Sequence, residues 1–243
     1  MPPATPLGYK SNSSRLLRGL GDGVYFLFPL ALILTLCLLG VSALDRQTQI
    51  EQQTGTNLFP TNKVLEVEIT LAKEDWNTIR NQSRNLFEAL EAKRKDGPVK
   101  GLYTWVTAKV KIDGEEFGEV GLRKKGFVGS QSTSRPSFKI KLNHTNKQAQ
   151  INGLTMLTFN NNQQDISLMS QAMGYALYNA AGSPAPRCGY ARITLNGQNL
   201  GVYSHVESMR EPLLKRGFGD DRGTLYEGTV VDFFRGWDKA FEK

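Results

Sequence analysis

Six cationic side chains gather around one glycine-containing loop in the stretch LRKKGFVGSQSTSRPSFKIKL. Within residues 122–142 they are Arg123, Lys124, Lys125, Arg135, Lys139 and Lys141. Strand alternation in SFKIKL places Lys139 and Lys141 on one face, about 7 Å apart, opposite the apolar residues. If a strand ending in GEVGLR pairs with this one, Arg123 joins them. Backbone N–H groups freed by Gly126 and Gly129 would then help to cradle phosphate oxygens.

This cationic loop also has a plainer interpretation. Lysines on the edge strand of a sheet discourage edge-to-edge aggregation, so the same residues fit a solvated, positively charged face. The loop lacks the G-x-x-x-x-G-K-[ST] pattern, and a single Gly-x-x-Gly is a weak signal. The anion site and the solvated face both remain open on the residues alone.

The sequence offers few candidate residues for catalysis by a cysteine, histidine or serine nucleophile or for a metal site. Cys37 lies in a long apolar run and Cys188 stands alone in the part of the chain that follows, so no disulfide can form within that part. The only histidines are His144 and His205, and no G-x-S-x-G elbow supplies a serine nucleophile. Cys188 fits a small buried residue better than a nucleophile. No zinc site or other metal site is predicted.

The composition predicts one ordinary folded domain with an appendage. The chain has 243 residues, of which 40% are hydrophobic, and this is enough for a core. Its formal net charge is +7. No long basic run with interleaved aromatic residues accompanies this charge, so no nucleic-acid partner is predicted.

The chain before the folded domain divides into three segments. They are a cytoplasmic arm at 1–23, an uncharged run at 24–44 and a polar tether at 45–62, followed by the folded domain at 63–243. The uncharged run is long enough to cross a bilayer as a helix. Because cations precede it, we expect a membrane anchor with the bulk of the chain outside the cytoplasm. Val41-Ser42-Ala43 resembles a cleavage site, so secretion after signal cleavage is the alternative.

The order of elements in the folded domain predicts an α+β fold, mainly an antiparallel sheet with packed helices. Strands are expected at 65–71, 105–112, 117–123, 137–142 and 223–228, with a two-stranded hairpin over 191–207, and helices at 74–95, 165–182 and 211–215. Tight hairpin turns are expected at Asp113-Gly114 and at Asn196-Gly197. Met169 and Met173 are expected to face the core.

The ordered succession of segments resembles the spore-coat protein H (CotH) kinase family. The segments are LEVEITLAKEDW, GLRKKGFVGSQS, RPSFKIKLN, LTFNNNQQDISLMSQAMGYALYNAAGSPAPR, ITLNGQNLGVYSHVESM and LLKRGFGDDRGTLYEG, spanning residues 64–228. Each segment alone carries little information, whereas the ordered set is specific. The resemblance implies an atypical protein-kinase-like fold that binds ATP with Mg²⁺ or Mn²⁺ and phosphorylates Ser or Thr residues of exported proteins. Some members are adhesive cell-surface proteins.

The resemblance also implies roles for single residues. The cofactor-binding residues that it implies are Arg123, Lys125, Gly126, Gly129, Ser130, Lys139, Lys141 and Glu207. Lys139 and Lys141 would hold phosphates, and which of the two does so stays open. Glu207 would pair with a lysine to orient phosphate, as in protein kinases, or else be solvated on its strand.

Further matches to the family lie after the cationic strands. Asn160, Asn161 and Asp165 match an Asn-rich turn, where capping of the following helix is the simpler role. Arg187 also matches, in the APR segment.

The end of the sequence departs from the family pattern. Members carry later acidic motifs expected to bind metal and assist transfer, and Trp237-Asp238 comes too soon after LYEG to be one of them. The catalytic residues therefore stay unidentified, and we expect the chain to be a fragment. Two functions remain: an extracytoplasmic ATP-dependent Ser/Thr kinase, or a non-catalytic surface module with the same fold. Whether the chain is an enzyme stays open.

Overall fold

The computed structural model describes residues 57–241, apart from 92–95, 99–100 and 102. The membrane-spanning helix predicted at 24–44 lies outside the described residues. Among the helices that the structure describes, none combines the length and the apolar character that a bilayer crossing needs.

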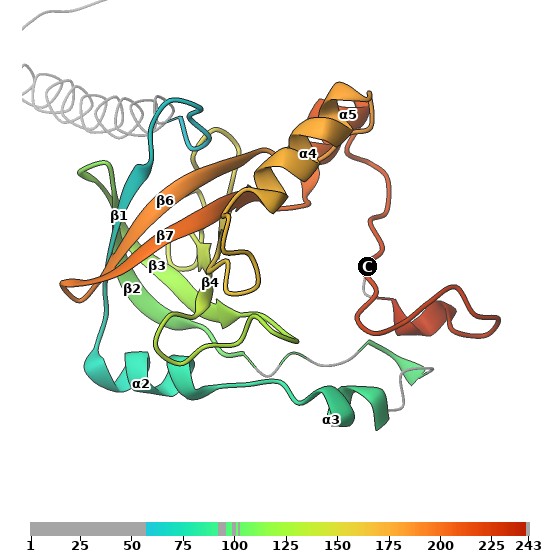
Figure 1. Cartoon of the computed structure of the whole chain (residues 1–243), viewed down its shortest axis with the longest axis horizontal. Helices are drawn as coiled ribbons and strands as arrows, with labels where there is room; N and C mark the ends of the chain where they lie inside the picture. The colour runs from blue at the N-terminus through green and yellow to red at the C-terminus, as the bar shows by residue number, and fades with distance from the viewer. Residues whose placement is uncertain (1–56, 92–95, 99–100, 102, 242–243) are drawn as a thin grey trace, which may run out of the picture. The chain divides into compact units, whose positions relative to one another are not determined.

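Seven strands form a closed barrel in the order β1-β2-β3-β4-β5-β7-β6 (Figure 1). They are β1 (Leu65–Thr70), β2 (Val106–Ile112), β3 (Glu115–Lys125), β4 (Ser137–Lys141), β5 (Met156–Asn160), β6 (Cys188–Leu195) and β7 (Gln198–Glu207). Neighbouring strands are antiparallel except β1 and β6, which run parallel. This parallel pair, in which Leu65 lies beside Ala191 and Ile69 beside Leu195, closes the barrel.

The predicted α+β, kinase-like fold is wrong, because the described chain is mostly one closed sheet with few helices. The strands alternate between buried and more exposed residues, as in Leu65, Val67 and Ile69 of β1. A sheet with only one apolar face must bury that face against something. Closure lets the apolar faces of all seven strands bury one another, so no layer of helices is required.

Five short helical segments are named in the part of the chain that the structure describes. They are α2 (Lys73–Asn81), α3 (Leu86–Glu91), α4 (Ser170–Ala180), α5 (Glu211–Phe218) and the 3₁₀ helix η2 (Asp238–Ala240). The single helix predicted at 74–95 is thus two helices. The chain is extended at Gln82, and the Asn85 side chain accepts a hydrogen bond from the Phe87 N–H at 2.9 Å. Asn85 therefore starts a new helix by capping it.

The two predicted hairpin turns are confirmed. Asp113 and Gly114 both have positive φ, at 51° and 86°, and so do Asn196 and Gly197, at 48° and 80°. Two consecutive residues with positive φ match the twist of antiparallel strands, which explains the Asp-Gly and Asn-Gly pairs.

Helix α4 lies on the opposite side of the barrel from α2 and α3 (Figure 1). The prediction that its methionines face the core is wrong, because Met169 is 51% exposed and Met173 is 61% exposed. Near its start the helix is joined to β5 by a polar contact, in which the Asn160 amide donates to Gln171 Oε1 at 2.9 Å. Helical periodicity identified an apolar stripe here but not whether the barrel covers it.

Candidate functional site

The outer face of β3, β4 and β5 gathers the predicted cations into rows. Arg123 lies beside Lys139, and Lys125 lies beside Ser137 in the next row toward the strand ends. Lys141 lies beside Gly121 in the row on the other side. Since same-face residues of a strand are about 7 Å apart, a ligand spanning two rows can meet three of these cations. We call Arg123, Lys125, Lys139 and Lys141 the outer cation rows.

Lys124 does not belong to the outer cation rows. It points to the inside of the barrel, is 1% exposed, and donates from Nζ to the Arg80 carbonyl at 2.7 Å. That carbonyl lies in the last turn of α2, where unpaired carbonyl groups attract cations. Burial lowers the pKa of the Lys124 ammonium. Strand alternation therefore splits three consecutive cations between two faces, and Lys124 holds a helix in place.

Lys125 reaches into a polar pocket of about 290 Å³ at the end of the outer cation rows. Its Nζ donates to Asn160 Oδ1 at 2.5 Å, and the Asn160 amide in turn donates to Gln171 of α4. Carboxamide side chains also line the pocket at Asn162 and Gln164. Carboxamides offer both donors and acceptors without charge, so the Lys125 ammonium is the charged donor that an anion in this pocket would meet.

The electrostatic environment of Lys125 makes its charge sensitive to pH. Burial lowers its pKa to about 8, and the neighbouring cations Lys139 and Arg123 act in the same direction. The carboxylate of Glu227 acts in the opposite direction. An anion in the pocket would offset the burial and the repulsion, and would therefore favour the ammonium form.

The glycine-containing loop beside the pocket is held by hydrogen bonds from an earlier part of the chain. The Gln131 side chain accepts from the Arg84 N–H at 2.5 Å and donates to the Arg84 carbonyl at 2.8 Å. The Tyr103 hydroxyl donates to the Gly126 carbonyl at 2.7 Å. Gly126 has a φ of 124°, a conformation that side-chain-bearing residues avoid.

Two N–H groups of this loop are already used within it, which limits the predicted phosphate cradle. The Phe127 N–H donates to Ser130 Oγ at 3.0 Å, and the Ser130 N–H donates to the Phe127 carbonyl at 3.1 Å. Gly129, at a φ of 74°, faces the pocket side chain Gln164. The loop therefore lines the pocket, and the main positive contribution comes from the strands.

The Asn-rich turn has a role that sequence reasoning missed. Asn161 is buried and donates to the carbonyls of Ser130 and Arg135, at 3.1 and 2.8 Å. It thus ties both ends of the glycine-containing loop to β5. Capping falls to Asp165, whose Oδ2 accepts from the Ser170 N–H at 2.9 Å at the start of α4. Only the run of amide residues hints at such a role in the sequence.

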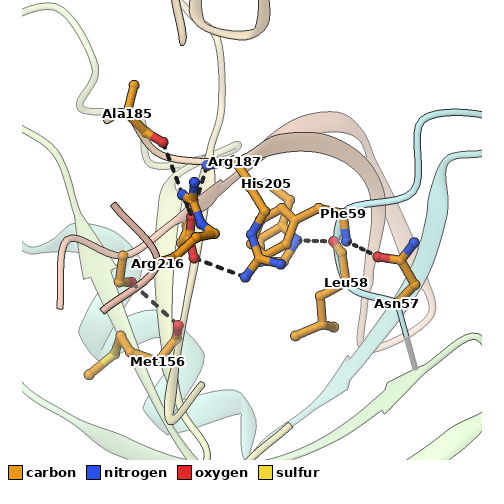
Figure 2. Close-up of polar contacts among 10 residues, drawn as sticks. Asn57, Leu58, Phe59, Met156, Ala185, Arg187, His205 and Arg216 are labelled. Carbon is orange, nitrogen blue, oxygen red and sulfur yellow. Dashed lines mark hydrogen bonds and ion pairs between the residues drawn. The ribbon is translucent and has the colours of Figure 1, made fainter. Parts of the chain in front are cut away.

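The structure does not bring Glu207 to the outer cation rows. Glu207 lies beside Leu157, whose side chain is in the core, so it faces the inside of the barrel near one end. There it accepts from Arg187 at 2.9 Å and from Arg216 at 2.6 Å (Figure 2). Burial raises its pKa, but the hydrogen bonds from Arg187 and Arg216 outweigh burial and lower the pKa overall. Glu207 therefore joins β7 to α5 and to the segment before β6.

Carboxylates suited to a metal ion are scarce in this part of the molecule. Among the described residues, no group of three or more His, Cys, Asp or Glu side chains converges on one point. Asp165 lines the pocket, but its two oxygens accept hydrogen bonds from Ser167 and Ser170. The described residues therefore do not by themselves fit a divalent cation.

The cation-bearing half of the barrel coincides with a family match. Residues 122–242 match the family model described as CotH kinase protein. The chain belongs to the CotH family. It is also 36% identical, over 67 residues, to the inner spore coat protein H-like protein of Bacillus subtilis (strain 168). That alignment covers 28% of this chain and 22% of the relative, so the chain spans about a fifth of the relative's length.

The CotH match is narrower than the resemblance from which it was expected. It begins at Leu122, in the middle of β3, and leaves out β1, β2 and α2. All of the outer cation rows and the Asn-rich turn lie within the matched residues. The pocket therefore lies within the matched residues, whereas Tyr103 and Arg84, which hold the loop, lie outside them.

Proposed function

We propose that this CotH protein binds ATP through the outer cation rows and transfers its γ-phosphate to Ser or Thr residues of exported proteins. The observation that carries the proposal is the convergence of Lys125, half-buried in a carboxamide-lined pocket, with the Arg123–Lys139 pair one row away. Phosphoryl transfer depends on positioning and on charge stabilisation, and both fit a fixed set of cations on a rigid sheet. The family description as kinase proteins agrees with this chemistry.

The cations would take different parts of the nucleotide. Lys125, at the pocket, would meet the phosphate nearest the carboxamides, and these uncharged side chains would bind polar groups of the nucleotide. Arg123 and Lys139 would neutralise the phosphate oxygens in the next row, since a cation gains most beside a multiply charged anion.

A matched pair of double variants tests ATP binding. Lys139→Met with Lys141→Met removes two cations from β4, and we expect at least tenfold weaker ATP binding by calorimetry, since each charge-assisted contact contributes about 1.5–3 kcal/mol. Lys109→Met with Lys111→Met removes two cations with the same spacing from β2, away from the pocket, and should leave affinity unchanged. If the two folded double variants bind ATP equally well, the outer cation rows do not bind ATP and are a solvated, positively charged face.

A non-catalytic surface module is the second candidate, because α4 exposes apolar side chains at Met169, Met173 and Leu177. Exposed apolar patches commonly mark contacts with other proteins. Incubation with labelled ATP and a Ser/Thr-rich acceptor separates the two. Labelled acceptor supports the kinase, whereas ATP binding without transfer by the full gene product supports the module.

We also propose that the barrel works outside the cytoplasm, since an uncharged run such as 24–44 is typical of exported proteins. Protease added to intact cells should degrade the barrel. Protection of the barrel in intact cells, with degradation only after lysis, would contradict this location.

A further inference from the structure

Residues 57–60 belong to no strand, and Leu58 and Phe59 lie beside His205 and Arg187 (Figure 2). Leu58 is 2% exposed, and Phe59 is also buried within the core. Among the described residues, no main-chain hydrogen bond joins this segment to another strand or loop. Its attachment therefore rests on side chains and on one carbonyl group.

His205 of β7 makes the main contacts with this segment. Its ring stacks on Phe59 at 4.6 Å between centroids, and its other face stacks on Phe159 of β5 at 4.7 Å. Its Nδ1 lies 2.9 Å from the Leu58 carbonyl oxygen, which identifies Nδ1–H as the donor. The imidazole is thus enclosed by two aromatic rings and holds the segment by one hydrogen bond.

The charged groups around this ring come from only a few elements. Arg187, before β6, lies over Phe59 at 4.6 Å, and Glu207 of β7 binds both Arg187 and Arg216 of α5. Residues 57–60 and Phe159 bring no charge. Arg187 opposes a proton on His205 and Glu207 favours one, so these two charges act on the pKa of His205 in opposite directions, and both matter less than burial.

Burial is therefore the main influence on the titration of His205. It lowers the pKa of the imidazole from 6.5 to about 4, while the Leu58 carbonyl acts in the opposite direction. A proton added to the enclosed ring would place an imidazolium between two apolar rings, out of reach of water. If residues 57–60 left, the same imidazolium would be hydrated.

The next attachment along the chain limits how far such a release would extend. Lys63 binds the Asp113 carboxylate at 2.6 Å, and the Glu66 N–H donates to the same carboxylate at 3.0 Å. Strand β1 begins at Leu65 and is paired on both sides, with β2 and with β6. The barrel therefore stays closed by its own ladders when residues before Lys63 detach.

We propose that residues 57–60 form a releasable strap and that His205 is its latch, so that protonation of His205 in mildly acidic surroundings opens the strap while the barrel stays folded. Opening exposes Phe59 and Phe159 and frees the chain before Lys63 from the barrel. This device links acidity to the position of the upstream chain, whatever the barrel binds.

Histidine titration by NMR on the full chain tests the link directly, because the chain has only two histidines. If protonation opens the strap, then weakening the strap must raise the pKa of His205, since such coupling is reciprocal. Because protonation opens the strap, we expect the wild-type His205 pKa to lie between about 4, the value of the enclosed ring, and 6.5, and to rise further toward 6.5 in Phe59→Ala. His144 should titrate identically in both. An unchanged His205 pKa in a folded Phe59→Ala variant would overturn the proposal.

Limited proteolysis with thermolysin tests the opening itself, since this protease cuts before apolar residues such as Leu58. With a latch pKa of about 4 when closed and 6.5 when open, opening should be ~30-fold more favourable at pH 5 than at pH 7.5. Rates are normalised to an unstructured peptide of the same sequence. His205→Phe should lose this pH dependence, and His144→Phe should keep it. Digestion of the barrel at the same rate as the strap would also contradict the proposal.

Discussion

The Glu207→Gln substitution should destabilise the barrel far more than its conservative character suggests. The Glu207 side chain is fully buried and accepts three hydrogen bonds: from the Arg187 side chain at 2.9 Å, from the Arg187 N–H at 3.0 Å and from Arg216 at 2.6 Å. Glutamine keeps the shape but offers one acceptor oxygen and no charge. Its amide group would also point a donor at a guanidinium.

The expected loss follows from the strength of these contacts. Hydrogen bonds to a charged group contribute about 1.5–3 kcal/mol and neutral ones about 0.5–1.5 kcal/mol, so the change costs roughly 1 kcal/mol per bond. The Arg187 and Arg216 side chains are 42% and 37% exposed, and water restores part of this loss. We therefore expect the free energy of unfolding to fall by about 2 kcal/mol.

Urea unfolding at pH 7.5 measures this loss, with Glu66→Gln as the matched control. Glu66 pairs with Arg192 on the outer face, where both side chains are about half exposed. Such a surface pair contributes about 0–1 kcal/mol, so its loss should be small. Because the pKa of Glu207 is lowered, its contribution is present above the unfolded pKa and disappears as pH falls through the folded one. If Glu207→Gln costs no more than Glu66→Gln, the buried ion pairs do not hold the barrel end.

Two further predictions concern the pocket. Because the pKa of Lys125 is about 8, ATP affinity measured by calorimetry should fall about tenfold between pH 7 and pH 9 as the ammonium loses its proton. The Lys125→Arg variant should show no such fall. If it shows the same fall, a group other than Lys125 is losing the proton. Gly126→Ala should lower the free energy of unfolding by at least ~1 kcal/mol more than Gly118→Ala. Both glycines have positive φ, but a Cβ at Gly126 would lie 3.1 Å from the Ser130 carbonyl oxygen, whereas a Cβ at Gly118 would meet no atom within 4 Å. Equal losses in urea unfolding would show that the loop is not packed as described.

The local features of the fold were largely readable from the sequence. Turn chemistry located both hairpins, and alternation in SFKIKL placed Lys139 and Lys141 on one outer face. These features depend on residues a few positions apart, where sterics and periodicity act directly. The closure of the barrel depends instead on β1 lying beside β6, which pairs Leu65 with Ala191. No local pattern specifies that partner.

The candidate site shows the same division. Alternation assigns each cation to a face, and it correctly separates Lys124 from Lys125 once β3 is known to continue to its last residue. Sequence reasoning grouped all three consecutive cations because the end of a strand is the least certain part of a prediction. The pocket was not predictable, since the contact of Lys125 with Asn160 requires β3, β4 and β5 to be adjacent.

The position of Glu207 explains why a family resemblance and a strand pattern can disagree. In the resemblance, Glu207 is a partner for a phosphate-binding lysine. In the barrel, the register that puts Lys139 beside Thr158 also puts Thr158 beside Val206, so Val206 shares the outer face and Glu207 must face inward. One residue along a strand reverses the face, and no side-chain rotation restores it. Within the described residues, the carboxylate that acts on the pocket lysine is Glu227, which lies after α5. A charge partner for the outer cation rows is therefore better sought in the segment following α5 than on β7.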